Sequence, residues 1–207
     1  MPIIHHPHSS VVDAAIDALP VGACVATDAD GTLWAGDVGD DTVRWIGAEV
    51  EPSYDVAAYL RRMVTDYHGG CREAATALHP HAHHVDALRR FLATRIRPRA
   101  HLVAALRRAL DRGVHVWIVS ASPALSARVG ATLVGLDGIG VLALETTPDG
   151  VIEPATVGPG KVAAWQARGL PPVNLALGDS RWDEPLLAHA HVGFWLDEPD
   201  AMPSPET

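Results

Sequence analysis

The chain has 207 residues, and 48% of them are hydrophobic, which is enough to bury the core of one ordinary domain. Sixteen basic against 25 acidic residues give a net charge of −9, which argues against nucleic acid or an anionic membrane as the main partner. A phosphorylated small molecule is not excluded, because a bound divalent cation can invert the local field.

Neither the cysteines nor the N-terminal segment indicates an extracellular protein. Cys24 and Cys71 cannot build a disulfide framework, and neither has a spacing typical of a metal site. Residues 1–10 are polar, rich in histidine and expected to be mobile, and no apolar run is long enough to span a membrane. We therefore expect a cytoplasmic protein without membrane contact. The oligomeric state stays open.

Short, nearly continuous apolar runs predict the strands of a parallel sheet that is covered on both faces. These runs are residues 21–27, 114–119, 141–146, 173–177 and 191–196. Helical patterns separate them, at residues 10–19, at 102–110, from Pro123 onward and at 161–168. Ser10 and Ser122 are the expected N-caps, and Gly113 and Gly169 the expected helix stops. The alternation predicts an α/β fold with a doubly wound, Rossmann-like parallel sheet.

Residues 37–97 interrupt this alternation directly after the first predicted strand. They contain no strand-like run, and apolar residues recur with helical spacing at 56–67 and 85–96. A segment of this length is too long for a loop, so we expect a small helical cap domain over residues 37–97. Residues 1–36 and 98–207 then form the α/β core domain. Residues 198–207, rich in proline and acid, are expected to fray.

Polar side chains gather where the predicted strands end, which is where ligands bind in open α/β sheets. One group follows the first strand, one follows the second strand before a helix whose free N–H groups can bind an anion, and one follows the fourth strand. A lysine begins another helix after Gly158, Pro159 and Gly160. The residues concerned are Asp28, Asp30, Ser120, Ala121, Lys161, Asp179 and Asp183.

The order of these groups resembles that of the haloacid dehalogenase superfamily of phosphohydrolases. The specific parts are Asp28-Ala29-Asp30-Gly31-Thr32-Leu33 and Gly178-Asp179-Ser180 with Asp183, while Ser120 and Lys161 add support by their order. The resemblance covers almost the whole chain. The predicted helical cap of residues 37–97 looks like the small cap of the phosphoserine-phosphatase-like branch.

The resemblance implies a Mg²⁺-dependent phosphatase that acts on a small phosphomonoester. Asp28 would attack phosphorus and form an aspartyl-phosphate, and Asp30 would protonate the leaving oxygen and later accept a proton from water. Asp28, the backbone carbonyl of Asp30 and Asp179 would bind Mg²⁺, with Asp183 as a further ligand or a group beside it. Binding alone does not need both acids, which argues against a catalytically silent phospho-ligand-binding member.

The remaining roles concern the substrate. Lys161 would screen the repulsion between Asp28 and the phosphate, and Ser120 with the adjacent Ala121 amide would hold phosphoryl oxygens. Asp37 lies nine residues after Asp28, where that branch places an acid facing the substrate amine. Asp37 therefore binds a cationic or hydroxylated substrate group, or it caps the helix that begins near Asp40.

Each of these residues also has a purely structural alternative. Asp30-Gly31 is a common turn signal, and Asp179 and Asp183 can cap a helix. Ser120 can bond to backbone, and Lys161 can be an ordinary solvated lysine. Because dehalogenases of the superfamily attack carbon without such an acid, Asp30 favours phosphoryl transfer. A phosphotransferase that uses the same intermediate would differ only in the acceptor.

Other features bear on the substrate or on a second metal. Ser120-Ala121-Ser122 replaces the Ser-Gly-Gly of phosphoserine phosphatases, which argues against phosphoserine as the substrate. Arg72 is the candidate for binding a substrate carboxylate, and Trp34 either lines the pocket or packs in the core. A histidine cluster has a spacing that matches no standard zinc site. It consists of His79, His81, His83 and His84.

Overall fold

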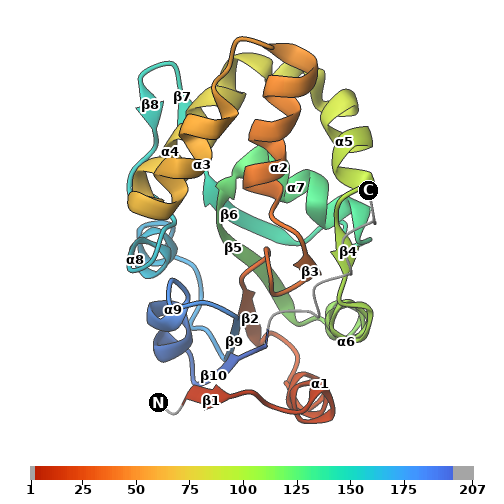
Figure 1. Cartoon of the computed structure of the whole chain (residues 1–207). Coiled ribbons are helices and arrows are strands. Elements are labelled where there is room, and N and C mark those ends of the chain that lie inside the picture. The colour runs from red at the N-terminus through yellow and green to blue at the C-terminus, as the bar shows by residue number, and fades with distance from the viewer. Residues whose placement is uncertain (1–2, 198–207) are drawn as a thin grey trace.

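The computed structural model describes residues 3–197, and its central feature is a six-stranded sheet with helices on both faces (Figure 1). The strands are β1 (Ile3–His5), β2 (Cys24–Thr27), β5 (His115–Pro123), β6 (Gly140–Leu144), β9 (Leu175–Gly178) and β10 (Val192–Trp195). Their order is β1-β10-β9-β2-β5-β6, and each neighbouring pair is parallel. The predicted α/β fold is confirmed.

Helices cover the sheet on two sides. They are α1 (Ser9–Asp17), α6 (Ala100–Asp111), α7 (Ala124–Leu133), α8 (Gly160–Ala167) and α9 (Glu184–His189). Successive side chains of β2 point to opposite faces: Val25 packs in the apolar cluster of α1, α6 and α7, and Ala26 packs in that of α8 and α9. This two-sided burial explains why the strand is continuously apolar.

A second group of helices lies over one end of the sheet (Figure 1). It is bounded by an antiparallel pair of short strands, β3 (Trp34–Ala35) and β4 (Arg97–Pro98). Between them lie α2 (Val38–Trp45), a π-helical turn (Ile46–Val50), α3 (Val56–Thr65), α4 (Tyr67–Leu78), a 3₁₀ segment (His79–His84) and α5 (Val85–Ala93). We call residues 38–93 the helical insert.

The helical insert shares its apolar core with the sheet. Trp45 of α2 and Leu88 and Leu92 of α5 are buried in the same cluster as Leu106 of α6 and Ile118 of β5. The insert is therefore fixed against the sheet through buried side chains as well as through β3 and β4. The division into two domains at residues 36/37 and 97/98 stays a prediction.

The N-terminal segment differs from the sequence-based expectation. Residues 3–5 are not mobile, because they form the edge strand β1 and pair in parallel with β10. Ser10 is not the cap of α1: the helix begins at Ser9, and the His8 ring accepts a hydrogen bond from the Ser10 backbone N–H at 3.3 Å.

Two further boundaries are wrong in the sequence-based assignment. The pattern at 56–67 is not one helix, because α3 ends at Thr65 and the Asp66 side chain caps α4 by accepting from the Gly69 N–H at 3.0 Å. The run 141–146 ends as a strand at Leu144, and a hairpin of β7 (Thr146–Thr147) and β8 (Gly150–Val151) follows.

The described residues contain no helix that combines the length and the apolar character needed to cross a membrane. Residues 198–207, for which fraying is predicted, lie outside the described residues.

Candidate active site

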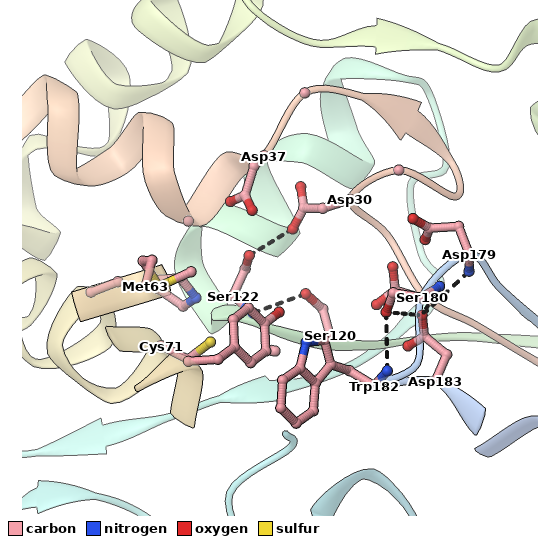
Figure 2. Close-up of a pocket in the computed structure, with 18 of the residues that line it drawn as sticks. Asp30, Asp37, Met63, Cys71, Ser120, Ser122, Asp179, Ser180, Trp182 and Asp183 are labelled. Atoms are coloured by element: carbon pink, nitrogen blue, oxygen red, sulfur yellow. Dashed lines mark hydrogen bonds between the residues drawn. The ribbon is translucent and has the colours of Figure 1, made fainter. Parts of the chain in front are cut away.

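A cavity of about 460 Å³ lies between the carboxyl ends of the central strands and the helical insert (Figure 2). Its lining includes the strand-end residues and Asp37, for which the sequence predicts catalytic, substrate-binding or metal-binding roles. These residues are Asp28, Asp30, Asp37, Ser120, Ala121, Lys161, Asp179 and Asp183. The structure thus brings together groups from four separate stretches of the chain, and their chemical roles stay predictions.

Lys161 joins two of the buried carboxylates. Its ammonium lies 2.5 Å from Asp28 Oδ1 and 2.5 Å from Asp183 Oδ1. All three side chains are almost inaccessible to solvent, and Lys161 is the only lysine in the chain. The reading of Lys161 as a solvated lysine is therefore wrong, since the start of α8 places its side chain inside the protein.

The protonation of this group is governed by burial and by the neighbouring charges. Burial alone would lower the pKa of Lys161, but the Asp183 and Asp28 carboxylates outweigh it and raise the pKa above its ordinary value. Burial raises the pKa of Asp28 well above its ordinary value, Asp183 acts in the same direction, and Lys161 opposes them. The Lys161 ammonium alone therefore does not return the pKa of Asp28 to its ordinary value.

Asp183 also organises the loop after β9. Its Oδ2 accepts hydrogen bonds from the Ser180 hydroxyl at 2.8 Å and from the Ser180 backbone N–H at 3.1 Å. Although Asp183 directly precedes α9, its side chain makes no capping bond to that helix. The capping alternative for Asp183 is therefore wrong.

Asp179 lies against the turn that follows Asp28. The Thr32 hydroxyl donates to Asp179 Oδ1 at 2.5 Å, and a Cβ on Gly31 would lie only 2.3 Å from Asp179 Oδ2. Gly31 also has a φ of +77°, which favours glycine. The turn therefore needs glycine for the close approach of Asp179, and Thr32 is a contact that sequence reasoning missed.

The acidic side chains are arranged so that they could hold a metal ion. Asp28, Asp179 and Asp183 each offer an oxygen, and these oxygens lie within 4.8 Å of one another. When all three acids are ionised, they and the Lys161 ammonium carry a net charge of −2, and their oxygen donors suit a hard divalent cation such as Mg²⁺. The donor set therefore fits the predicted Mg²⁺. The backbone carbonyl of Asp30 as a further ligand stays a prediction.

The Asp30 side chain makes contacts of its own. Its Oδ1 accepts from the Trp34 indole N–H and from the Val38 backbone N–H, both at 2.8 Å. Its Oδ2 faces the Ser122 hydroxyl at 2.6 Å (Figure 2). Burial raises the pKa of Asp30, and these hydrogen bonds act in the opposite direction without cancelling it. The carboxyl is thus fixed in one orientation at the cavity.

Ser120 and Ser122 depart in part from expectation. Ser122 does not cap α7; its hydroxyl donates to Asp30 instead, a contact that sequence reasoning missed. The Ser120 hydroxyl accepts a hydrogen bond from the Ser122 backbone N–H at 3.0 Å. This is the contact with the backbone that the structural alternative for Ser120 predicts. Ser120 and Ala121 nevertheless line the cavity, directly before α7 begins.

Asp37 is both a helix cap and part of the cavity lining. Its Oδ1 accepts from the Asp40 N–H at 2.8 Å at the start of α2, which confirms the capping prediction. Burial raises the pKa of Asp37 well above its ordinary value, and the carboxylates of Asp30 and Asp40 add to the effect. Its binding to a substrate group stays a prediction.

Some candidate residues lie away from the site. Arg72 is paired with Glu153 and does not line the cavity, so its predicted role toward a substrate carboxylate has no support. Trp34 is fully buried in the core, and its contribution is the indole hydrogen bond to Asp30. The histidines of residues 79–84 belong to no metal-ligating cluster among the described residues.

The helical insert contributes a wall that sequence reasoning did not recognise. Tyr59 and Met63 of α3 and Tyr67 and Cys71 of α4 line the cavity. The Tyr67 ring stacks on Trp182 with centroids 4.6 Å apart and an interplanar angle of 10°. The signal was present, because Tyr59, Met63 and Tyr67 repeat every four residues, but periodicity alone does not distinguish a core face from a cavity face.

Three solved structures have a similar fold. A Bordetella pertussis Tohama I protein of unknown function has a TM-score of 0.63 and 16% identity, covering 84% of this chain and 90% of that one. A substrate-bound phosphoserine phosphatase has a TM-score of 0.53 and 16% identity, and the match covers 87% of this chain and 89% of the phosphatase. A HAD family hydrolase from Salmonella enterica serovar Typhi has a TM-score of 0.55 and 17% identity. The match covers 84% of this chain but only 62% of the Salmonella protein.

At these identities the structures show the fold alone, and no curated protein matches the chain. The sequence model of the haloacid dehalogenase-like hydrolases, in contrast, matches residues 25–188, which include the strand-end acids, Lys161 and the helical insert. The chain therefore belongs to the haloacid dehalogenase-like hydrolase family.

Proposed function

We propose that the chain is a Mg²⁺-dependent phosphatase that hydrolyses a small phosphomonoester through an aspartyl-phosphate intermediate. The observation that carries the proposal is the convergence of Asp28, Asp30, Lys161 and the Asp179–Asp183 loop on one cavity. Membership of a hydrolase family supports the reaction class. The acid two residues after Asp28 favours phosphorus over carbon as the atom attacked.

In the first step, Asp28 attacks the phosphorus atom and the bond from phosphorus to the ester oxygen breaks. Asp30 Oδ1 already accepts two N–H donors, so a proton on this carboxyl belongs on Oδ2, beside Ser122. From there Asp30 donates the proton to the leaving alkoxide. Asp28 then carries the phosphoryl group, which divides one difficult reaction into two easier ones.

In the second step, Asp30 accepts a proton from water while the water attacks the phosphorus atom of the aspartyl-phosphate. Inorganic phosphate leaves and Asp28 is restored. Lys161 offsets the negative charge between Asp28 and the phosphoryl oxygens, and the Ser120 hydroxyl with the Ala121 backbone N–H holds those oxygens. Mg²⁺, held by Asp28, Asp179 and Asp183, would supply further positive charge at the phosphoryl group.

The helical insert would act as the cap. It forms one wall of the cavity, and exclusion of water by this wall during the reaction would strengthen the charge interactions inside. The cap would span residues 37–97 and the catalytic core residues 1–36 and 98–207.

The test is hydrolysis of p-nitrophenyl phosphate by the purified protein with Mg²⁺. We expect EDTA to abolish the activity and Mg²⁺ to restore it, and Asp28→Asn to lower kcat by about 10³-fold or more. Asp55→Asn is the matched control, because Asp55 caps α3 outside the cavity and asparagine can replace it there. Full activity of Asp28→Asn, or activity without a metal ion, would refute the mechanism. Added alcohols distinguish hydrolysis from phosphoryl transfer to another acceptor.

A further inference from the structure

The two walls of the cavity have opposite chemistry. The strand-end wall carries the acids and Lys161, whereas the helical insert presents Tyr59, Met63, Tyr67 and other weakly polar side chains. Figure 2 shows Met63 and Cys71 on one side of the cavity, with Asp179 and Asp183 on the other. A phosphoryl group bound at Asp28 therefore directs its alcohol part toward the insert.

Positive charge is scarce around this space. Among the described residues, Lys161 is the only cationic side chain that lines the cavity. It is already paired with Asp28 and Asp183 at 2.5 Å each. Lys161 therefore serves the phosphoryl end and leaves no cation for a second anionic group on the substrate.

Three arginines that are next in sequence to cavity-lining residues already have partners. Arg62 pairs with Glu73 at 3.0 Å, and Arg72 pairs with Glu153. The Arg181 guanidinium lies 4.6 Å from the centre of the Trp182 ring, on an exposed side chain. None of these guanidinium groups lines the cavity.

The insert side adds acids and, among the described residues, no cation that lines the cavity. Asp37 lines the cavity, and Asp40, one helical turn further on, accepts the Tyr59 hydroxyl hydrogen bond at 2.7 Å. A carboxylate or second phosphate on the leaving alcohol would lose its water among apolar side chains and face Asp37 without a counter-ion. Such an arrangement is strongly disfavoured in a site of low dielectric constant.

We infer that the leaving alcohol of the substrate is small and carries no anionic group, so that the substrate class is the monophosphates of uncharged or cationic alcohols. The inference rests on the proposed function and narrows it. The volume of about 460 Å³ lies toward the lower end of the usual range for ligand cavities, and the phosphoryl group and metal ion share it. This favours a compact alcohol over a nucleoside or a long chain.

The test uses pairs of esters that differ by one carboxylate. Phosphoethanolamine is compared with phosphoserine, and ethyl phosphate with phosphoglycolate, by their kcat/KM values at saturating Mg²⁺. We expect the ester without the carboxylate to be preferred by at least about tenfold in both pairs. If all four esters are hydrolysed, and phosphoserine and phosphoglycolate have kcat/KM values equal to or above those of their uncarboxylated partners, this inference is overturned. The proposed phosphatase function would still stand. If the protein hydrolyses none of the four esters nor p-nitrophenyl phosphate, the proposed function fails as well.

A gain-of-function variant probes the insert wall directly. Met63→Arg adds a cation to this wall, and Met63→Gln is a control of similar length without charge. We expect Met63→Arg to raise the kcat/KM of phosphoserine relative to phosphoethanolamine by about tenfold, and Met63→Gln to leave this ratio as in the wild type. An unchanged ratio in a Met63→Arg protein that unfolds at the wild-type temperature would refute the assignment of this wall to the leaving alcohol.

Discussion

The two walls of the cavity differ in how their side chains are fixed. On the strand-end wall, Asp30 is fixed by three hydrogen bonds, and Lys161 lies between two carboxylates. On the insert wall, Tyr59 has one hydrogen bond, to Asp40, and Tyr67 is fixed by stacking on Trp182. Met63 is fixed by packing, and Cys71 packs there as well and hydrogen-bonds with the Tyr67 side chain.

This difference corresponds to two kinds of work. Bond-breaking chemistry needs groups held in one orientation, which the strand-end wall achieves with short polar contacts between distant parts of the chain. Selection of an alcohol needs shape and the right charge, which weakly polar side chains of a helical insert can supply. We therefore expect variants of the strand-end wall to lower kcat, and variants of the insert wall to change the choice of substrate.

The largest effect is expected for Lys161→Met. Removal of the ammonium leaves Asp28 and Asp183 buried beside each other without a counter-charge. We expect the free energy of unfolding without Mg²⁺ to fall by about 3–5 kcal/mol, as measured by urea denaturation. Arg168→Met is the matched control, because Arg168 ends the same helix with a half-exposed ion pair, and its loss should cost less than about 1 kcal/mol. Similar losses in the two variants would contradict a role for Lys161 as the central counter-charge.

A smaller effect is expected for Ser122→Ala. The variant removes the hydroxyl that faces Asp30 Oδ2, so the acid loses one of its three contacts. We expect kcat for p-nitrophenyl phosphate to fall about tenfold, equivalent to about 1.4 kcal/mol. Ser126→Ala is the control: this buried serine, four residues further along the chain in α7, bonds Thr42 at 2.7 Å and does not line the cavity. It should lower stability by about 1 kcal/mol without the loss in kcat. Equal kcat values in the two variants would remove Ser122 from the site.

The difference between the walls also explains what could be predicted from the sequence. The strand-end acids were predictable because parallel strands end at one edge of the sheet, so Asp28 and Asp179 had to lie close together. The contacts that orient these acids were not predictable, because they join distant residues. Ser122 and Asp30 are 92 positions apart, and Thr32 and Asp179 are 147 positions apart. Single hydroxyl groups at turns follow no periodicity that a pattern could reveal.

The misassigned elements share a different cause. β1 is only three residues long, and its strand conformation depends on pairing with β10. The break between α3 and α4 was hidden because apolar spacing continues to Tyr67, while the cap formed by Asp66 depends on a local hydrogen bond. In both cases the deciding interaction is with a particular partner, and periodicity does not report it.

The smallest effect is expected on the insert side, for Asp37, where capping and cavity charge must be separated. Asp37→Asn keeps a good N-cap for α2, whereas Asp37→Ala removes the side-chain oxygen that accepts the Asp40 N–H. We expect the free energy of unfolding to fall by about 1 kcal/mol in Asp37→Ala and to change little in Asp37→Asn. Both variants remove a carboxyl from the cavity lining, so both should raise the kcat/KM of phosphoserine relative to phosphoethanolamine by a few-fold.

A change of this ratio in Asp37→Ala alone would assign the effect to the altered start of α2, because only that variant loses the cap. A lower ratio in both variants would show that Asp37 assists the binding of an anionic ester, opposite to its expected repulsion. The same shift in both, with a stability loss only in Asp37→Ala, is the result that separates the two roles. It would place substrate choice in the charge of the insert side, while the strand-end wall keeps the chemistry.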